Sequence, residues 1–277
     1  MTGADASWHT TAVPVKPLPV TPAPAATLVL LRDRAAGEVV LLLLQRHRAS
    51  KFAAGDFVFA GGKVETDDCP ADAARWCAGL DRKNAARLLG LEGAPRAALA
   101  YWIGAIREAF EEVGVLLAYG SEGRPVRVAR ARFEAYRRAC QADKGAFWDM
   151  VRAERFTLAT DRLRYFAHWI TPEENPLRFD TRFFAAPMPP GQRAVADGKE
   201  IIAVRWMTVA EAWAARAAGE INLRLPTIKN LALFEGASSS AHAFERLVAQ
   251  TIPTIRPRLV LEHGERRVLL PGDAGYY

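Results

Sequence analysis

Short apolar runs separated by turn-forming residues dominate the first quarter of the chain. Residues 27–32 and 39–45 are rich in leucine, valine and threonine, and six polar or small residues lie between them. Runs of this length and composition predict two strands joined as a hairpin. Phe57-Val58-Phe59 predicts a third, shorter strand that ends at Gly61-Gly62. Further strands are predicted over 163–170, 181–186 and 201–207, and a second hairpin over 258–262 and 266–270 around His263-Gly264.

A helical period replaces this pattern in the middle of the chain. Alanine, arginine, leucine and tryptophan recur at helical spacing over residues 70–91, which predicts a small helical insert. The next helix has the clearest rhythm, and its apolar face carries Leu99, Ile103, Ile106, Phe110, Val113 and Leu117. At 100° per residue, the glutamates of this helix are expected on the side opposite that face. Other helices are predicted over 129–154 and 209–218, with one or two more before the second hairpin.

Composition narrows the class of protein. The chain has 277 residues, of which 50% are hydrophobic and 25% charged, so it is long and apolar enough to bury a sizeable core. Five prolines between Pro14 and Pro24 predict an extended leader over 12–25, without the basic and apolar regions of a secretory signal. No apolar run approaches the roughly 18 residues of a membrane-spanning helix. Three cysteines without a C-x-x-C pair favour a reducing cytosol over a disulfide framework.

The net positive charge alone does not identify a partner. The formal net charge is +6, but the arginines are spread along the chain instead of gathering in one strongly basic run. Binding to nucleic acid is therefore not indicated, and a small molecule that carries phosphate remains open.

Three glutamates are the strongest candidates for chemistry. Glu108, Glu111 and Glu112 are related by steps of three and four residues, so a helix brings their carboxylates onto one patch. Like charges at this spacing raise one another's pKa unless a cation neutralises them, and hard oxygen ligands suit Mg²⁺ or Mn²⁺. The glycine pair Gly61-Gly62 allows the backbone to approach closely and to offer a carbonyl oxygen. An ordinary solvated helix face is the alternative explanation of the same triplet.

A motif around these residues favours the catalytic explanation. The segment R-E-A-F-E-E-V-G-V from Arg107 to Val115 resembles the second half of the Nudix signature, G-x5-E-x7-R-E-U-x-E-E-x-G-U, with Ala109 as the aliphatic position. Gly62 matches the opening glycine, and Asp68 stands where the signature has glutamate. Between these halves the signature has seven residues, whereas this chain has 38, from Cys69 to Ile106. This interrupted motif resembles the interrupted Nudix box of the subfamily that contains the peroxisomal coenzyme A diphosphatase.

Other segments are similar to the same subfamily. They are the run L-L-L-L-Q-R-H-R-A-S-K-F-A-A-G-D-F-V-F-A-G-G-K-V-E and the later D-T-R-F-F-A-A and E-I-I-A-V-R-W-M-T-V-A-E-A, so the similarity spans about residues 27–235. The resemblance implies the Nudix fold, an α/β (α+β) architecture in which a mixed β-sheet is sandwiched between helices. We expect a leader over 1–25, a hydrolase domain over 26–235 with a helical insertion over 69–100, and a C-terminal extension over 236–277 packed on the domain.

The resemblance also assigns roles to residues of this chain. Glu111 and Glu112 are the leading metal ligands, Glu108 is a third ligand or the base that activates water, and the Gly61 carbonyl is a further ligand. Arg107 is expected to orient the carboxylates, together with Asp68. Some Nudix enzymes take the base from a later loop instead, and Glu200 is the candidate there.

Weaker candidates surround this site. Arg46 and Arg48 follow a predicted strand and either grip phosphates or face solvent. Lys63 lies in the glycine loop and either contacts phosphate or is simply exposed. Phe57, Phe59 and Trp206 are expected to fill the core rather than stack on a base. The histidines at 47, 168, 242 and 263 lack ligand-like spacing, so we expect them to be structural or exposed.

The function implied by the resemblance is hydrolysis of a diphosphate linkage with bound Mg²⁺ or Mn²⁺. Coenzyme A or an acyl derivative is the leading substrate, which would give 3′,5′-ADP and phosphopantetheine or its acylated form. ADP-ribose, NADH or a dinucleoside polyphosphate are alternatives, as is a Nudix-fold nucleotide-binding module without turnover. We expect a cytoplasmic enzyme with a small-molecule diphosphate substrate and no nucleic-acid or membrane partner. The C-terminal tail either caps the sheet or mediates self-association as a homodimer.

Overall fold

The computed structural model describes residues 20–34, 37–50, 53–127, 130–262 and 265–276. Its strands are β1 (Ala23–Arg34), β2 (Glu38–Arg46), β3 (Phe57–Val58), β4 (Ala60–Lys63), β5 (Ala118–Tyr119), β6 (Thr157–Leu158), β7 (Arg164–Ile170), β8 (Phe179–Pro187), β9 (Ile201–Met207), β10 (Thr254–Ile255), β11 (Arg258–Glu262) and β12 (Glu265–Leu269). Its α-helices are α1 (Arg82–Leu89), α2 (Pro95–Val113), α3 (Arg130–Ala142), α4 (Gly145–Ala153), α5 (Val209–Ala217), α6 (Leu225–Ala232) and α7 (Ser240–Val248). Short 3₁₀ turns are η1 (Thr66–Asp68), η2 (Ala73–Trp76) and η3 (Thr160–Arg162).

A mixed sheet forms the centre of the molecule. Its strands run in the order β10-β7-β8-β1-β2-β3, with β4 paired to β1 and β9 paired to β2. Strand β1 is parallel to β8 along its length and antiparallel to β2 and β4 on its other edge. The first half of that edge pairs with β4 and the second half with β2. This fork brings the glycine pair of β4 beside the start of β1, under the central helix.

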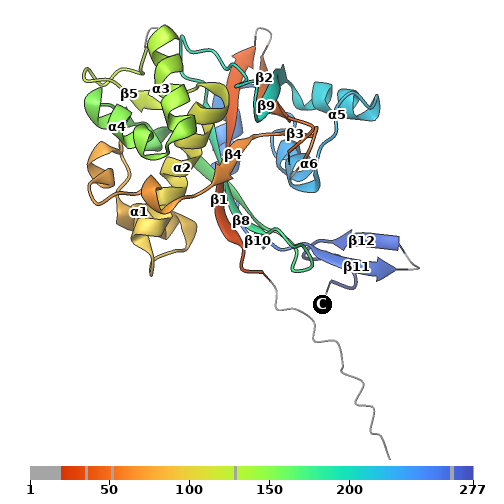
Figure 1. Ribbon diagram of the computed structural model, residues 1–277. Helices are drawn as coiled ribbons and strands as arrows, with labels where there is room; N and C mark the ends of the chain where they lie inside the picture. The colour runs from red at the N-terminus through yellow and green to blue at the C-terminus, as the bar shows by residue number, and fades with distance from the viewer. Residues whose placement is uncertain (1–19, 35–36, 51–52, 128–129, 263–264, 277) are drawn as a thin grey trace, which may run out of the picture.

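The alternation of side chains along β1 and β2 builds two cores. Leu28 and Leu30 point to one face of the sheet, whereas Val29 and Leu31 point to the other, and all four are buried. Helices α1 to α4 cover the first face, and α5 to α7 cover the second (Figure 1). Strands buried on both faces explain why residues 39–44 form one continuous apolar run instead of an alternating one.

The predicted architecture is confirmed, with differences at several boundaries. The first strand begins at Ala23, because pairing with β8 starts there, so the predicted leader over 12–25 is too long at its end. The rest of that leader, up to residue 19, lies outside the described residues, as does His263-Gly264. The helix predicted over 129–154 is divided into α3 and α4, because Asp143 accepts a hydrogen bond from the Gly145 amide and turns the chain between them.

The glutamates of α2 do not form an ordinary solvated helix face, which was the alternative explanation of the triplet. The apolar face of this helix is buried as predicted, and Glu108 and Glu112 are also only 9% and 4% exposed. The helix is covered on both sides, because β4 and η1 pack against its acidic side. Burial of two carboxylates requires compensating partners, and these partners define the candidate site.

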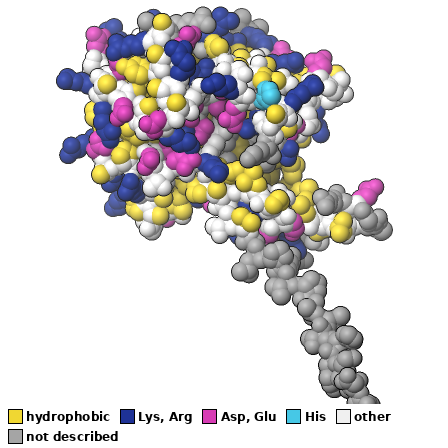
Figure 2. Space-filling model, in the orientation of Figure 1, with side chains coloured by type: hydrophobic (Ala, Val, Ile, Leu, Met, Phe, Trp, Pro, Cys, Tyr) yellow, Lys and Arg dark blue, Asp and Glu magenta, His cyan; other side chains and the backbone are white. Residues whose placement is uncertain are grey.

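The C-terminal residues form a hairpin that stands away from the main sheet (Figures 1 and 2). Strands β11 and β12 pair only with each other among the described residues. Before them, α7 packs on β7 and β1, and β10 adds to the edge of the main sheet. No helix in the described part of the chain is long and apolar enough to cross a membrane.

Candidate active site

The side chain of Arg107 is the centre of the candidate site. It lies on α2, is 1% exposed, and uses its guanidinium to bind groups from the glycine loop, from η1 and from its own helix. Nε donates to Asp68 Oδ1 over 2.5 Å, and Nη2 donates to Asp68 Oδ2 over 3.1 Å and to the Lys63 carbonyl over 2.9 Å. Nη1 donates to Glu108 over 2.8 Å and to Glu111 over 3.2 Å. The five bonds match the five N–H donors of the side chain.

The position of Asp68 is fixed by the turn in which it lies. Its carboxylate oxygen Oδ2 accepts a hydrogen bond from the Glu65 backbone N–H, with 2.8 Å between oxygen and nitrogen, as part of a reciprocal capping box at the start of η1. Gly104 of α2 leaves room for this carboxylate, because a Cβ at Gly104 would lie 3.1 Å from Asp68 Oδ2. The structure brings Asp68 and Arg107 into contact, and their joint role in orienting the glutamates stays a prediction. Here an aspartate, not the glutamate of the signature, forms a bidentate pair with the arginine.

The two glycines of β4 allow the acidic side of α2 to approach the sheet. The Gly61 amide donates to Glu112 Oε2 over 2.9 Å. A Cβ at Gly62 would lie 2.6 Å from the Glu108 carboxylate, which is closer than real side chains come. Glycine at position 62 is therefore required by this close approach, and the first half of the motif meets the second despite the 38 residues between Asp68 and Arg107.

A second arginine connects the helix with a later loop. Arg46, at the end of β2, has Nη2 2.6 Å from Glu200 Oε1 and Nη1 3.9 Å from Glu112 Oε1. The His47 amide donates to the Glu200 carbonyl, and Asp197 accepts the amides of Glu200 and Ile201. The structure thus brings Arg46 and Glu200 beside Glu112, as the sequence-based roles require.

Three contacts at the C-terminal end of α2 could not be predicted from the motif. Arg137 of α3 donates to the Glu111 carbonyl over 2.8 Å and also to the Glu112 carbonyl, and Gln141 donates to the Glu111 carbonyl over 2.7 Å. Gly114 ends the helix in the left-handed conformation at φ 69°. A cation at this end also complements the helix dipole. The one sequence signal was the polar Arg137-to-Gln141 spacing on a predicted helix, which does not indicate a partner.

Burial perturbs the ionisation of the site. It raises the pKa of Glu108 to about 7, against the opposing effect of Arg107. Burial and the neighbouring carboxylates of Glu108 and Glu200 hold the pKa of Glu112 well above its ordinary range. The pKa of Glu111 is also raised by burial. Burial therefore disfavours the charged form of all three glutamates.

The carboxylates do not form a ready-made ligand cluster. Within the described ranges, no group of three or more His, Cys, Asp or Glu side chains is arranged to hold a metal ion. The physical reason is that Glu108 and Glu111 bind Arg107, whereas Glu112 binds the Gly61 amide. The assignment of Glu108, Glu111, Glu112 and the Gly61 carbonyl as metal ligands stays a prediction.

The weaker candidates are placed at the rim or in the core. The side chains of Lys63 and Arg48 are exposed, and the contact of Lys63 with Arg107 is made by its carbonyl. Phe57 and Phe59 are buried in the core, as predicted, and Trp206 packs partly buried against it. Among the predicted structural histidines, His168 is buried and bonded to Asp180, His242 is half-buried, and His47 is exposed.

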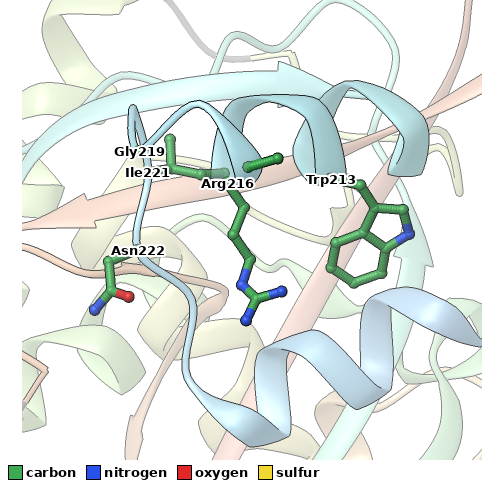
Figure 3. A pocket seen from close by; sticks show the side chains of 6 residues that line it. Trp213, Arg216, Gly219, Ile221 and Asn222 are labelled. Atoms are coloured by element: carbon green, nitrogen blue, oxygen red, sulfur yellow. The ribbon is translucent and has the colours of Figure 1, made fainter.

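A hollow of about 630 Å³ lies on the other face of the sheet, at the end of α5. It is lined by Trp213, Arg216, Ala217, Gly219, Ile221 and Asn222, and none of the predicted site residues borders it (Figure 3). It belongs to the layer of α5 and α6, whereas the Arg107 cluster belongs to the layer of α2.

Comparisons with known proteins find related sequences and structures. Acyl-coenzyme A diphosphatase NUDT19 of Xenopus laevis is 27% identical over 202 residues, which cover 62% of this chain and 53% of the relative, so the chain spans about half the length of that relative. A Nudix hydrolase structure from Alicyclobacillus acidocaldarius superposes with a TM-score of 0.67 at 24% identity, covering 81% of this chain and 96% of the other. The Nudix domain of Shewanella oneidensis NrtR, solved with ADP-ribose, gives 0.40 at 12% identity, with 82% and 90% covered.

The family assignment rests on a match over more than half of the chain. The model of the NUDT19 Nudix domain matches residues 91–233, which include α2 with Arg107 and all three glutamates. The Alicyclobacillus structure shares the fold. This chain belongs to the NUDT19 Nudix domain family of Nudix hydrolases.

Proposed function

We propose that this chain is a metal-dependent Nudix hydrolase that cleaves the diphosphate linkage of coenzyme A or an acyl-coenzyme A. The observation that carries the proposal is the Arg107 cluster, in which one buried arginine holds Asp68, Glu108 and Glu111 while Glu112 lies against the glycine loop. Similarity to an acyl-coenzyme A diphosphatase supports the substrate. The products would be 3′,5′-ADP and phosphopantetheine or its acylated form.

The donor set fits a hard divalent cation such as Mg²⁺ or Mn²⁺. All its donors are oxygens, and burial is the main cause that raises the pKa of Glu108 and of Glu112, with a neighbouring carboxylate adding to it in each case. Glu108, Glu111, Glu112 and the Gly61 carbonyl would hold the ion. When bound, it would offset the charge of the diphosphate and lower the pKa of a water molecule.

The chain's own residues would orient and activate the reactants. Arg107 keeps the carboxylates of Glu108 and Glu111 on one side of the helix, so their oxygens are directed before the substrate arrives. Arg46 lies between Glu112 and Glu200, where a guanidinium can bind a phosphate oxygen bidentately. Lys63 and Arg48 are both exposed, and both are proposed to contact the substrate.

Two residues are candidates for the base that takes a proton from water. Glu200 is ion-paired with Arg46 and half-exposed, so it is accessible from solvent. Glu108 has a pKa raised to about 7 by burial, which suits proton transfer near neutral pH. Glu200→Gln separates them, because it removes none of the proposed metal ligands: turnover falls with cation affinity intact if Glu200 is the base, and turnover stays near the wild-type value if Glu108 is the base.

A substrate panel tests the proposal. The chain is incubated with Mg²⁺ or Mn²⁺ and coenzyme A, acyl-coenzyme A, ADP-ribose, NADH or a dinucleoside polyphosphate, and products are identified by mass. We expect 3′,5′-ADP from the first two substrates, with losses above about 100-fold in Glu111→Gln and Glu112→Gln. Glu122→Gln, an exposed glutamate with its side chain 76% accessible, is the matched control. Preferred cleavage of another substrate would replace coenzyme A, and no cleavage of any diphosphate would favour a nucleotide-binding module.

We also propose the division of the chain into functional parts. Residues 26–235 would form the hydrolase domain, residues 69–100 an insertion within the Nudix box, and residues 236–277 an extension packed on the domain. Burial of Ala243 and Leu247 of α7 against the second core supports the last assignment.

A further inference from the structure

The C-terminal hairpin is held by its own two strands and by the tail that follows it, where Arg258 donates to the Tyr276 carbonyl and the Tyr276 hydroxyl donates to the Arg256 carbonyl. Strands β11 and β12 pair with each other over five residue pairs, from Arg258–Leu269 to Glu262–Glu265, and make no extended contact with any other described helix or strand. Leu269 is buried at its base, but the rest projects from the body (Figure 1). A two-stranded hairpin is marginal in water, and three or more strands with an apolar face are normally needed for stability.

One face of this hairpin carries three apolar residues, and the register partner of Leu261 is Arg266. Leu259 lies opposite Val268, so the two share a face, and Leu261 follows on that face two residues later. Leu261 is 76% exposed and Val268 is 41% exposed, and both are among the few large apolar side chains that reach solvent in the described part of the chain. Figure 2 shows hydrophobic surface along the hairpin. Exposed apolar strands with an open edge favour pairing with another strand.

The sequence of β11 is complementary to itself when two copies run antiparallel. Its residues are Arg258-Leu259-Val260-Leu261-Glu262. A twofold axis at Val260 places Arg258 of each copy opposite Glu262 of the other, and Leu259 opposite Leu261. Opposite charges and apolar residues are then paired across the strands, which stabilises antiparallel sheets. The same operation on β12 would place Arg267 opposite its own copy, so like charges would meet there.

Backbone geometry permits this pairing. Along an antiparallel strand, alternate residues direct their N–H and C=O groups to opposite edges, and β12 occupies one edge of β11. In the symmetric register centred on Val260, odd-numbered residues lie opposite odd-numbered residues and even-numbered opposite even-numbered. The residues whose backbone N–H and C=O groups point away from β12 therefore meet the same residues of the second copy. The product is a four-stranded sheet in the order β12-β11-β11-β12, with Leu259, Leu261 and Val268 of both copies on one face.

From this edge we propose that the chain forms a twofold homodimer by antiparallel pairing of β11 with β11 of a second copy. The interface is isologous, as in most soluble dimers, and the occupant is a second copy because its charges complement the strand in this register alone. The hairpin lies away from the Arg107 cluster, so dimerisation is independent of the diphosphatase proposal.

Charge reversal tests this register. Full-length protein is analysed by size-exclusion chromatography with light scattering over a range of concentrations. We expect twice the chain mass for the wild type, and at least a tenfold increase in the dimer dissociation constant for R258E and for E262R. The combined R258E/E262R variant recovers the wild-type dissociation constant, because it reverses both ends of each pair. Arg267→Ala is the control for the pair between Arg267 and Glu262 within one hairpin, and it keeps the dimer mass.

A central substitution gives an independent result. V260K places two ammonium groups opposite each other on the axis, and we expect the mass of a single chain. Circular dichroism checks that each variant keeps its helices. A monomeric wild type would overturn the proposal. A V260K variant that remains dimeric would also overturn it. The same holds if R258E/E262R does not recover the wild-type dissociation constant after R258E and E262R have weakened the dimer.

Discussion

Replacement of Arg107 by methionine is the most informative perturbation of the site. Methionine keeps much of the length of the side chain but removes the cation and all five hydrogen bonds to Asp68, Glu108, Glu111 and the Lys63 carbonyl. Asp68 and Glu108 would then be buried without their principal partner. Breaking a buried charge pair from one side costs about 3–5 kcal/mol, because the remaining charge loses its compensation.

This loss is large enough to measure as a change in unfolding. For a chain of this size, each kcal/mol shifts Tm by about 2–4 °C, so we expect a decrease of roughly 6–20 °C. Urea unfolding followed by circular dichroism gives the free energy of unfolding directly. Arg107→Lys keeps one positive charge but not the planar fork, so its loss is expected to be intermediate.

A second substitution distinguishes uncompensated charge from lost packing. Asp68→Asn still offers an oxygen to the Glu65 amide but has no charge to bury. We therefore expect the Arg107→Met/Asp68→Asn variant to lose less stability than the sum of the single variants, with a coupling of about 0.5–3 kcal/mol. Additive losses, or a loss below about 1 kcal/mol in Arg107→Met, would refute the central position of Arg107.

Other predictions concern the surroundings of this cluster. In Gly62→Ala the new Cβ would lie 2.6 Å from the Glu108 carboxylate and force it to move. We expect the free energy of unfolding to fall by about 1–3 kcal/mol and Mn²⁺ binding, measured by calorimetry, to weaken. Unchanged Mn²⁺ affinity would contradict the close approach. Arg137→Ala removes the hydrogen bonds from a charged side chain to the last turn of α2, so urea unfolding should show a loss of about 1.5–3 kcal/mol in the free energy of unfolding. We expect Arg137→Lys to restore part of this loss. Equal stability of the wild type and both variants would show that Arg137 does not stabilise the end of α2. Burial raises the pKa of Glu108 in the folded protein from 4.5 to about 7. The stability that protonated Glu108 contributes is therefore fully present below about pH 4.5 and is lost as pH rises through about 7. In the metal-free protein, Glu108 should thus account for a loss of about 3 kcal/mol over that interval, since one pKa unit corresponds to about 1.4 kcal/mol, and an identical profile in Glu108→Gln would argue against this assignment.

Much of the fold follows from local patterns. The hairpin of β1 and β2 and the long helix α2 were predictable because strand alternation, turn residues and helical spacing are determined within a few residues. The burial of the acidic side of α2 was not predictable in this way, because it depends on contact with β4, and the long insertion separates β4 from the helix in the sequence. Helical periodicity shows that glutamates share a face, but not whether another element covers it.

The candidate site shows the same division. The Nudix motif predicted the association of Arg107 with Asp68 and the glutamates, and the glycine pair explained the close approach of the backbone. The support from Arg137 and Gln141 depends on the packing of α3 against α2, which the motif does not encode. Likewise, the sequence placed Glu200 before a strand but could not pair it with Arg46, because strand β9 had first to align with β2.

The proposed hydrolysis depends most on the affinity of the acidic side of α2 for a divalent cation, and Mn²⁺ binding followed by electron paramagnetic resonance measures this affinity directly. The wild type should bind Mn²⁺, and the triple variant Glu108→Gln/Glu111→Gln/Glu112→Gln, checked for folding by circular dichroism, should lose that binding, whereas Glu122→Gln should retain it. Equal binding by the folded triple variant and the wild type would contradict the account.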